Sequence, residues 1–228
     1  MYGNFVALNV KQKRKNYQRV VARNPFSPFE GSSGYKNIRM EGYPHFEECE
    51  FKNFFPFAII DFIDKEIPIS LSLTAYTPFI PGDVDNSSLP IAVFTYKIKN
   101  LSRETIKVFL SFSMMNPIGT DGTEKLNNCY NQCFGKNINN FFQTENLKGL
   151  FFTSKKYEKE SPKYGNISLL TDSTSFSYKS QWENEGWWSD FKNFWNEFEN
   201  GNFNKISSKE SPDKTTYWAS IGVSENIS

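Results

Sequence analysis

Apolar and polar residues alternate along much of the chain, as they do in β-strands that bury one face. In residues 67–76, apolar side chains occupy every second position, namely Ile67, Ile69, Leu71, Leu73 and Ala75. Residues 91–99 and 106–114 show a similar alternation, and the polar stretch KNLSRET lies between them. The pattern predicts a half-buried strand at 67–76 and a hairpin formed by the two strands that follow.

Several shorter β-type runs accompany these strands. They are FVALNV, FAIIDF, GLFFT, NISLLT, TSFSYK and TTYWASIGV, and Gly, Asn, Ser and Pro separate them. Many short strands without amphipathic helices between them predict a mainly all-β fold, an antiparallel β-sandwich with long loops. The Asn-, Gly- and Lys-rich region 116–146 has neither a strand period nor a helix period, so it is expected to form long loops.

One segment has a helical period instead. In GWWSDFKNFWNEFENG, aromatic residues recur at helical spacing, namely Trp187, Trp188, Phe191, Phe194, Trp195 and Phe198. Gly201 suits the C-terminal stop, which predicts one short aromatic-faced helix near residues 186–200. Such a stripe more often faces a core or an interface, so any ring that the sheets leave uncovered is expected to contact a partner domain.

Exposed tryptophans can also bind carbohydrate, because their flat faces stack on sugar rings. The candidates for such a substrate-binding surface are Trp182, Trp187 and Trp188. They support the alternative hypothesis of a free-standing carbohydrate-binding module.

The composition suits one folded domain. Aromatic residues make up 17% of the 228 residues, and the 26 basic and 25 acidic residues form no long block, so neither nucleic acid nor an anionic membrane is an expected partner. No apolar run approaches the roughly 18 residues of a membrane-spanning helix, and charges interrupt the N-terminal segment where a signal peptide would be apolar. The odd number of three cysteines suits a reducing compartment, and a cytoplasmic location is expected.

Metal-binding patterns in the chain are weak. His45, Cys49, Cys129 and Cys133 are zinc ligands by type, but neither pair has the usual two-residue spacing of a zinc knuckle. The stretch DVDNS resembles the first half of a calcium loop, but the sixth position is Ser88 rather than Gly and the twelfth is Phe94 rather than Glu. No metal ion and no cofactor are therefore expected.

Catalytic patterns are equally weak. Glycoside hydrolysis requires two carboxylates, and neighbouring acids occur at Glu47/Glu48, Asp61/Asp64 and Asp83/Asp85. With 25 acids in the chain, such neighbours arise by chance. No Gly-x-Ser-x-Gly motif and no Cys-Gly motif occurs. No catalytic residue is predicted.

Three segments taken together resemble a known family. They are YPHFEECEF (43–51), IPISLSLTAYTPFIPGDVDNSSLPIAVFTYKIKN (67–100) and FWNEFENGNF (194–203). In this order they are similar to the N-terminal domain of glycoside hydrolase family 116, which includes the bile-acid β-glucosidases, also called non-lysosomal glucosylceramidases. The resemblance implies a β-sandwich that packs against a separate C-terminal (α/α)6 toroid, which carries the glutamate nucleophile and the aspartate acid/base of a retaining β-glucosidase.

The resemblance also shapes what is expected of the chain itself. No position here matches the family's catalytic residues or its glycine-rich opening, so residues 1–228 are expected to be a single, incomplete sandwich domain, one piece of a split or truncated gene. Its role would be non-catalytic: to buttress the toroid and shape one wall of a cleft for β-glucosides. The open sheet edges and aromatic stripe would make the isolated chain poorly soluble or oligomeric. A third hypothesis is a remnant without function.

Overall fold

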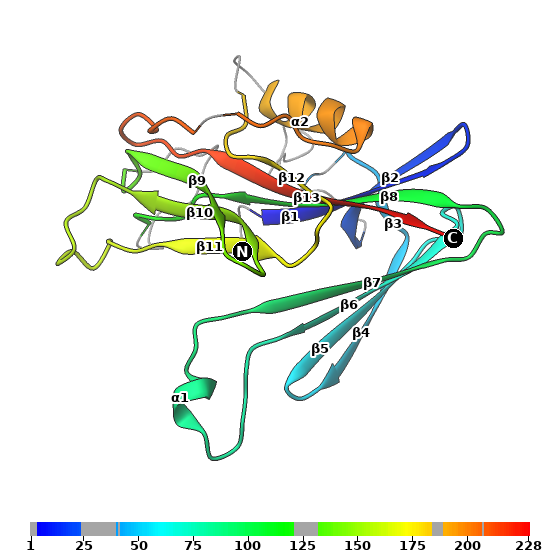
Figure 1. Ribbon diagram of the computed structural model, residues 1–228, viewed down its shortest axis with the longest axis horizontal. Coiled ribbons are helices and arrows are strands. Elements are labelled where there is room, and N and C mark those ends of the chain that lie inside the picture. The colour runs from blue at the N-terminus through cyan, green and yellow to red at the C-terminus, as the bar shows by residue number, and fades with distance from the viewer. Residues whose placement is uncertain (1–3, 24–39, 41, 121–131, 184–188, 207) are drawn as a thin grey trace, which may run out of the picture.

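The computed structural model describes residues 4–23, 40, 42–120, 132–183, 189–206 and 208–228 (Figure 1). The strands are β1 (Asn4–Gln12), β2 (Lys15–Arg23), β3 (His45–Phe46), β4 (Glu48–Phe54), β5 (Phe57–Ile63), β6 (Ile69–Tyr76), β7 (Val93–Asn100), β8 (Ile106–Met115), β9 (Asn137–Gln143), β10 (Lys148–Ser154), β11 (Ile167–Thr171), β12 (Phe176–Lys179) and β13 (Trp218–Ile227). The helices are α1 (Val84–Ser87) and α2 (Ser189–Asn200). The prediction of a mainly all-β fold is confirmed.

The strands form three sheets. A six-stranded sheet has the order β12-β13-β8-β1-β2-β3, a four-stranded sheet the order β4-β5-β6-β7, and a three-stranded sheet the order β11-β10-β9. Neighbouring strands are antiparallel except for β2 and β3. Figure 1 shows α2 on one face of the six-stranded sheet and the four-stranded sheet below the other face. The described part of the chain contains no helix long and apolar enough to cross a membrane.

The core between the two larger sheets is mainly aliphatic. β6 buries Ile69, Leu71 and Leu73 against Leu8 and Val108 of the six-stranded sheet. Each such side chain contributes roughly 1.5–3 kcal/mol by leaving water. The predicted strand at 67–76 is therefore confirmed, with its apolar positions facing the core as the alternation requires.

The predicted hairpin of β7 with β8 is wrong. β7 pairs with β6, whereas β8 pairs with β1 and β13 in the other sheet. The link between them crosses from one sheet to the other, and the Asn100 side chain holds it by donating to the carbonyl oxygens of Glu104 and Ile227, at 2.7 and 3.0 Å. The apolar positions of the two strands therefore face each other across the sandwich. Alternation identifies a strand and its buried face but not its neighbour.

The core on the other face of the six-stranded sheet is aromatic. α2 buries Phe191, Phe194, Trp195 and Phe198, each less than 10% exposed. The interpretation of the stripe as a core-facing surface is confirmed for these four rings, because the chain's own sheet covers them. The helix is confirmed from Ser189 to Asn200, and the first part of the predicted range lies outside the described residues.

The loop prediction for 116–146 is wrong in part, because β9 runs through it and pairs with β10. Asn116, Asn137 and Asn139 are buried and take part in hydrogen bonds. The Asn116 side chain donates to Asn139 Oδ1 at 2.9 Å, and the Asn139 side chain donates to the Ser180 carbonyl at 2.8 Å. Buried asparagines can occupy strand and core positions when their hydrogen bonds are satisfied. Because asparagine is polar, the hydropathy pattern of this region does not predict the strand. Residues 121–131 lie outside the described residues.

Candidate functional site

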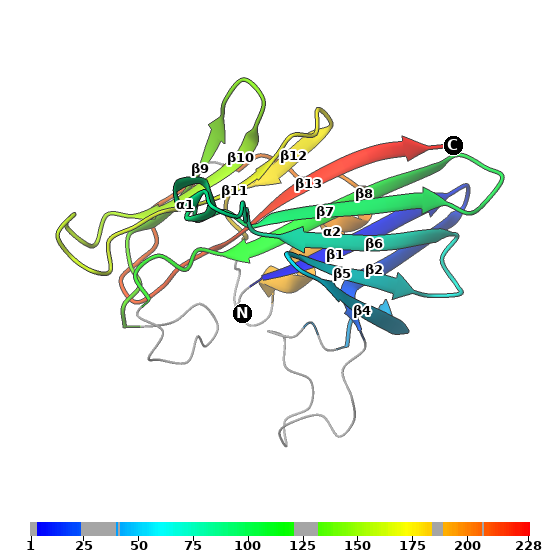
Figure 2. The same cartoon turned by 90° about the horizontal axis from the view of Figure 1, so that it is seen from below.

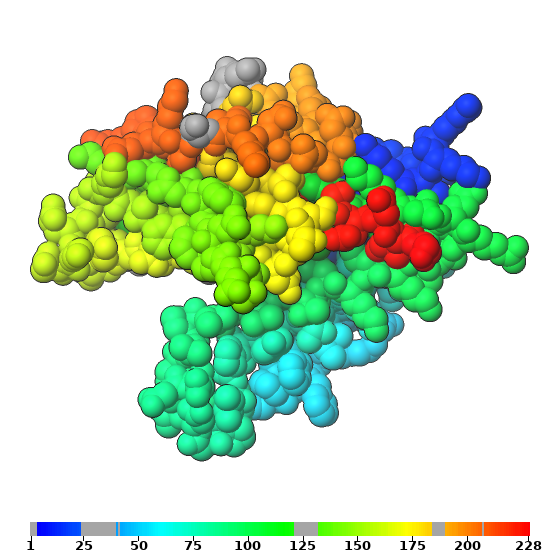
Figure 3. All heavy atoms as spheres, viewed as in Figure 1, coloured from blue at the N-terminus to red at the C-terminus, as the bar shows by residue number. Residues whose placement is uncertain are grey.

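A group of exposed apolar side chains lies on an extension at the far end of the four-stranded sheet. We call it the arm and define it as the β4–β5 turn, residues 54–57, together with the β6–β7 link, residues 77–92. Seven of its large apolar side chains are between 45% and 76% exposed, namely Phe54, Phe55, Phe79, Ile80, Val84, Leu89 and Ile91. Figure 3 shows the arm projecting away from the other two sheets. A cluster of this kind marks an interaction surface more often than it marks ordinary solvent-exposed chain.

The arm has a defined local structure. Gly82 has a φ of 82°, which only glycine adopts readily, and it turns the chain into α1. Asp83 caps α1 by accepting the Asn86 backbone N–H at 3.0 Å, and the Ser87 hydroxyl accepts the Ile80 N–H at 2.9 Å. The rings of Phe55 and Phe79 meet edge to face with centroids 5.0 Å apart, which joins the two parts of the arm. The apolar side chains are thus held on a structured support.

The cap on α1 gives the arm a dependence on pH. The hydrogen bonds from the Asn86 side chain and backbone hold the pKa of Asp83 below its ordinary value of 3.8. A carboxyl whose pKa is lowered by folding stabilises the folded form above the unfolded pKa, and this contribution is lost as the pH falls through the folded pKa. We expect the protection factor of the Asn86 amide, which is its intrinsic exchange rate at a given pH divided by its observed rate, to fall below about pH 4.

The measurement is amide exchange by NMR, with Asp83→Ala as the test variant and Asp85→Ala as the control. Asp83→Ala should give a low Asn86 protection factor at every pH, while Asp85→Ala should keep the pH profile of the wild-type protection factor. A wild-type protection factor that stays constant between pH 3 and 6 would contradict this role for Asp83.

The structure does not assemble the candidate metal ligands. In the described parts of the chain no three His, Cys, Asp or Glu side chains lie close enough together to hold an ion. His45 is buried, with Nδ1 2.7 Å from the Tyr43 carbonyl, and Cys133 Sγ lies 3.1 Å from Lys163 Nζ. Cys49 is half-buried, and burial raises the pKa of its thiol. Cys129 lies outside the described residues.

Two of the paired carboxylates, Asp61 and Asp64, form ion pairs with basic side chains of neighbouring strands. Lys52 Nζ on β4 lies 2.6 Å from Asp61 on β5. Arg19 on β2 donates to Asp64 at 2.7 Å and to Glu66 at 2.8 Å, and the Asp64 side chain is only 1% exposed. Glu47 and Glu48 are exposed. The Arg19–Asp64 pair joins the two sheets of the sandwich, so the acids at 61 and 64 have structural roles here.

The carboxyl of Asp190, in the first turn of α2, has a shifted pKa. Burial raises the pKa of Asp190 above its ordinary value of 3.8, although its carboxylate accepts the Phe191 backbone N–H at 2.9 Å. Burial and, to a smaller extent, the charge on Asp190 also raise the pKa of Tyr43. The Tyr43 ring packs on Trp195 with centroids 4.5 Å apart. This group of side chains borders the aromatic core.

The candidate sugar-binding tryptophans do not form a described surface. Trp182 is only 2% exposed, and its ring stacks on Phe194 and Trp218 at 4.5 and 5.2 Å between centroids. Its indole N–H donates to the Ser220 hydroxyl at 2.8 Å. The expectation that Trp182 offers an open face to a sugar is corrected, because both faces of its ring are covered. Trp187 and Trp188 lie outside the described residues.

Most of the exposed aromatic side chains in the described residues are instead phenylalanines, which are absent from the sugar-binding candidates. The motif NFFPFA contained a signal for them, because three Phe surround a proline in a position where a turn normally carries polar residues. In the structure, two of these three, Phe54 and Phe55, are more than 70% exposed. These two rings are exposed because they lie at the tip of the β4–β5 hairpin, beyond the part of the sheet that faces the core.

Fold and surface together define a class of protein: a layered all-β domain that presents a structured apolar arm. A family model described as beta-glucosidase 2, glycosyl-hydrolase family 116 N-term matches residues 1–228, the whole chain. The chain therefore belongs to the family of N-terminal domains of glycosyl-hydrolase family 116, and the resemblance found in the three sequence segments is confirmed. Membership of this family implies a C-terminal catalytic domain as the partner of the sandwich.

Proposed function

We propose that this domain is the non-catalytic N-terminal sandwich of a family 116 β-glucosidase and that it docks on the catalytic domain through the arm. The observation that carries the proposal is the exposed apolar surface of the arm in a domain of this family. An apolar surface of this kind on a domain with its own core is best explained by a protein partner.

The chemistry of the arm suits a stable interface. Phe55 and Phe79 are large rings of the kind that dominate binding energy when they enter a pocket on a partner. Their mutual contact and the hydrogen-bonded turn at Asp83 hold them in place before binding, which lowers the entropic cost of docking. An arm that is ordered before binding can also hold a fixed position beside the partner's active site.

The proposal divides the work of the enzyme between two domains. The catalytic (α/α)6 domain supplies the glutamate nucleophile and the aspartate acid/base, and the arm lines one wall of the cleft that accepts a β-glucoside. We place the assembled enzyme in the cytoplasm, because three cysteines in an otherwise ordinary composition suit a reducing compartment. The sandwich then acts on turnover by positioning the catalytic domain and not by contributing a reacting group.

An activity assay with an aryl β-glucoside tests this division. The purified chain is expected to show no turnover. A separately produced family 116 catalytic domain is expected to gain activity, or heat stability of its activity, when the chain is added. Turnover by the chain alone that persists through purification to homogeneity would contradict the proposal.

A further inference from the structure

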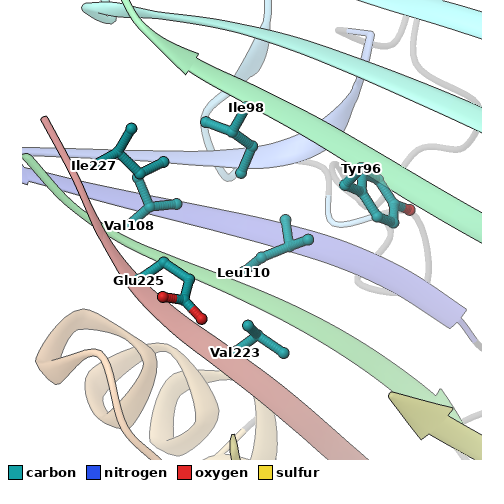
Figure 4. A pocket seen from close by; sticks show the side chains of 7 residues that line it. All are labelled: Tyr96, Ile98, Val108, Leu110, Val223, Glu225 and Ile227. Carbon is teal, nitrogen blue, oxygen red and sulfur yellow. The ribbon is translucent and has the colours of Figure 1, made fainter. Parts of the chain in front are cut away.

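A second surface feature lies between the two larger sheets, away from the arm. It is an apolar slot of about 230 Å³ between β7 on one side and β8 and β13 on the other (Figure 4). β7 contributes Tyr96 and Ile98, β8 contributes Val108 and Leu110, and β13 contributes Val223, Glu225 and Ile227. Burial raises the pKa of Tyr96 to about 12, so its hydroxyl remains protonated in this apolar setting. The volume is enough for two or three aliphatic side chains.

The slot exists because the two sheets differ in width. β7 is the last strand of the four-stranded sheet, whereas the six-stranded sheet continues past β8 to β13 and β12. Leu110 of β8 pairs with Val223 of β13, and the alternation places Glu225 and Ile227 on the same face as Val223. In Figure 2, β13 runs beside the four-stranded sheet, beyond β7. One more strand next to β7, about 4.8 Å away, would cover this part of β13.

β7 also has an open edge. It pairs with β6 along its whole length, from Val93 to Asn100, and none of the other described strands pairs with it. The outer edge of such a strand carries backbone N–H and C=O groups that can form a further ladder. An open ladder beside a slot for alternate side chains has the two features of a β-strand acceptor site, in which the backbone supplies affinity and the slot supplies specificity.

The charged side chains around the slot determine which strand can pair with β7. Along β7, Tyr96 and Ile98 point toward the slot while Lys97 and Lys99 point to the opposite face and are exposed. An antiparallel pairing of β7 with a second copy of β7 would bring these lysines together on one face, which is unfavourable. A strand with Glu or Asp at its outward positions would instead pair with Lys97 and Lys99. A Lys or Arg at one inward position would meet Glu225.

We propose that the edge of β7 is a binding site for one extended strand of another polypeptide. This strand has apolar residues at the alternate positions that fill the slot, acidic residues beside Lys97 and Lys99, and one basic residue beside Glu225. The site is separate from the arm and does not depend on the role proposed for the arm, so it can fail or succeed independently of the catalytic-domain partner.

The test is binding of the purified chain to an array of fluorescent nine-residue peptides. The peptides carry every combination of Val, Leu and Phe at the inward positions, with one inward Lys, and either Glu or Lys at the outward positions. We expect the Glu series to bind and the Lys series to bind at least tenfold more weakly. N-methylation of the best peptide at alternate residues, which removes backbone donors but keeps the side chains, should weaken binding at least tenfold.

Variants of the chain locate the site. Val223→Phe, which fills the slot, and Lys97→Glu with Lys99→Glu should each weaken binding of the best Glu peptide at least tenfold. Lys159→Glu with Lys192→Glu reverses the same charge on other elements and should leave binding unchanged. The proposal is overturned if no peptide of the array binds, if the N-methylated peptide binds as well as its parent, or if sedimentation shows a dimer that Lys97→Glu strengthens and that excludes the peptide.

Discussion

Replacing Phe194 by alanine is expected to lower the free energy of unfolding by about 3–5 kcal/mol, the range for removing a large aromatic ring from a core. Phe194 is fully buried at the centre of the aromatic core. Its ring stacks on Trp182 and Phe198, and Phe5 meets it edge to face with centroids 5.3 Å apart. The substitution removes contacts to rings from α2, from β1 and from the segment before α2. Because these rings lie on three different segments, they cannot easily move together to fill the cavity that the substitution leaves.

The measurement is urea unfolding followed by tryptophan fluorescence. The expected loss corresponds to a melting temperature roughly 10 °C lower for a chain of this size. Lys192→Ala on the exposed side of the same helix is the control and should change stability by less than about 0.5 kcal/mol. Equal stability of Phe194→Ala and the wild type would mean that α2 is not docked on the six-stranded sheet.

Replacing Glu197 by leucine is expected to cost about 3 kcal/mol, because it leaves the Lys179 ammonium buried without its main partner. The Lys179 side chain is fully buried, and it donates to the carboxylate of Glu197, which is 18% exposed. The loss falls at the lower end of the range for broken buried pairs, because Glu183 also lies 3.6 Å from Lys179.

The double variant separates loss of charge balance from loss of packing. Lys179→Met combined with Glu197→Leu removes both charges and keeps apolar volume, so it should recover most of the stability that Glu197→Leu loses. Chemical unfolding of the two single variants and the double variant gives the coupling between the two sites. If the double variant is as unstable as the sum of the single ones, the two side chains do not interact as the structure shows.

The spacing of apolar and aromatic residues along the chain predicts much of the fold correctly. The alternation over 67–76 identified β6 and its buried face, and the aromatic spacing identified α2, because both signals report which side of one element meets the core. Strand pairing did not follow from the same signals. β7 and β8 have the alternation of a hairpin, but they place their apolar faces against each other from opposite sheets, and only the three-dimensional arrangement distinguishes the two cases.

The exposed surface was harder to predict than the core. Trp182 was a reasonable candidate for a sugar-binding ring by residue type, yet it lies inside the core between Phe194 and Trp218. The rings that do face solvent, such as Phe55 and Phe79, come from two loops that are distant in sequence and meet only after β4, β5 and β6 have paired. The loop at 77–92 is also part of a segment that resembles the family. The resemblance identifies the family but does not indicate which side chains of the loop are exposed.

The most direct test of the central claim is a calorimetric titration of this chain with a separately produced family 116 catalytic domain. The wild-type chain is expected to bind, and Phe55→Ser with Phe79→Ser, which removes the two central rings of the arm, is expected to weaken binding at least a hundredfold. Leu101→Ser with Leu147→Ser removes two exposed apolar side chains outside the arm and should bind as the wild type does. Undiminished binding by the arm variant, with an unchanged circular dichroism spectrum, would contradict the claim, as would the absence of any binding by the wild-type chain.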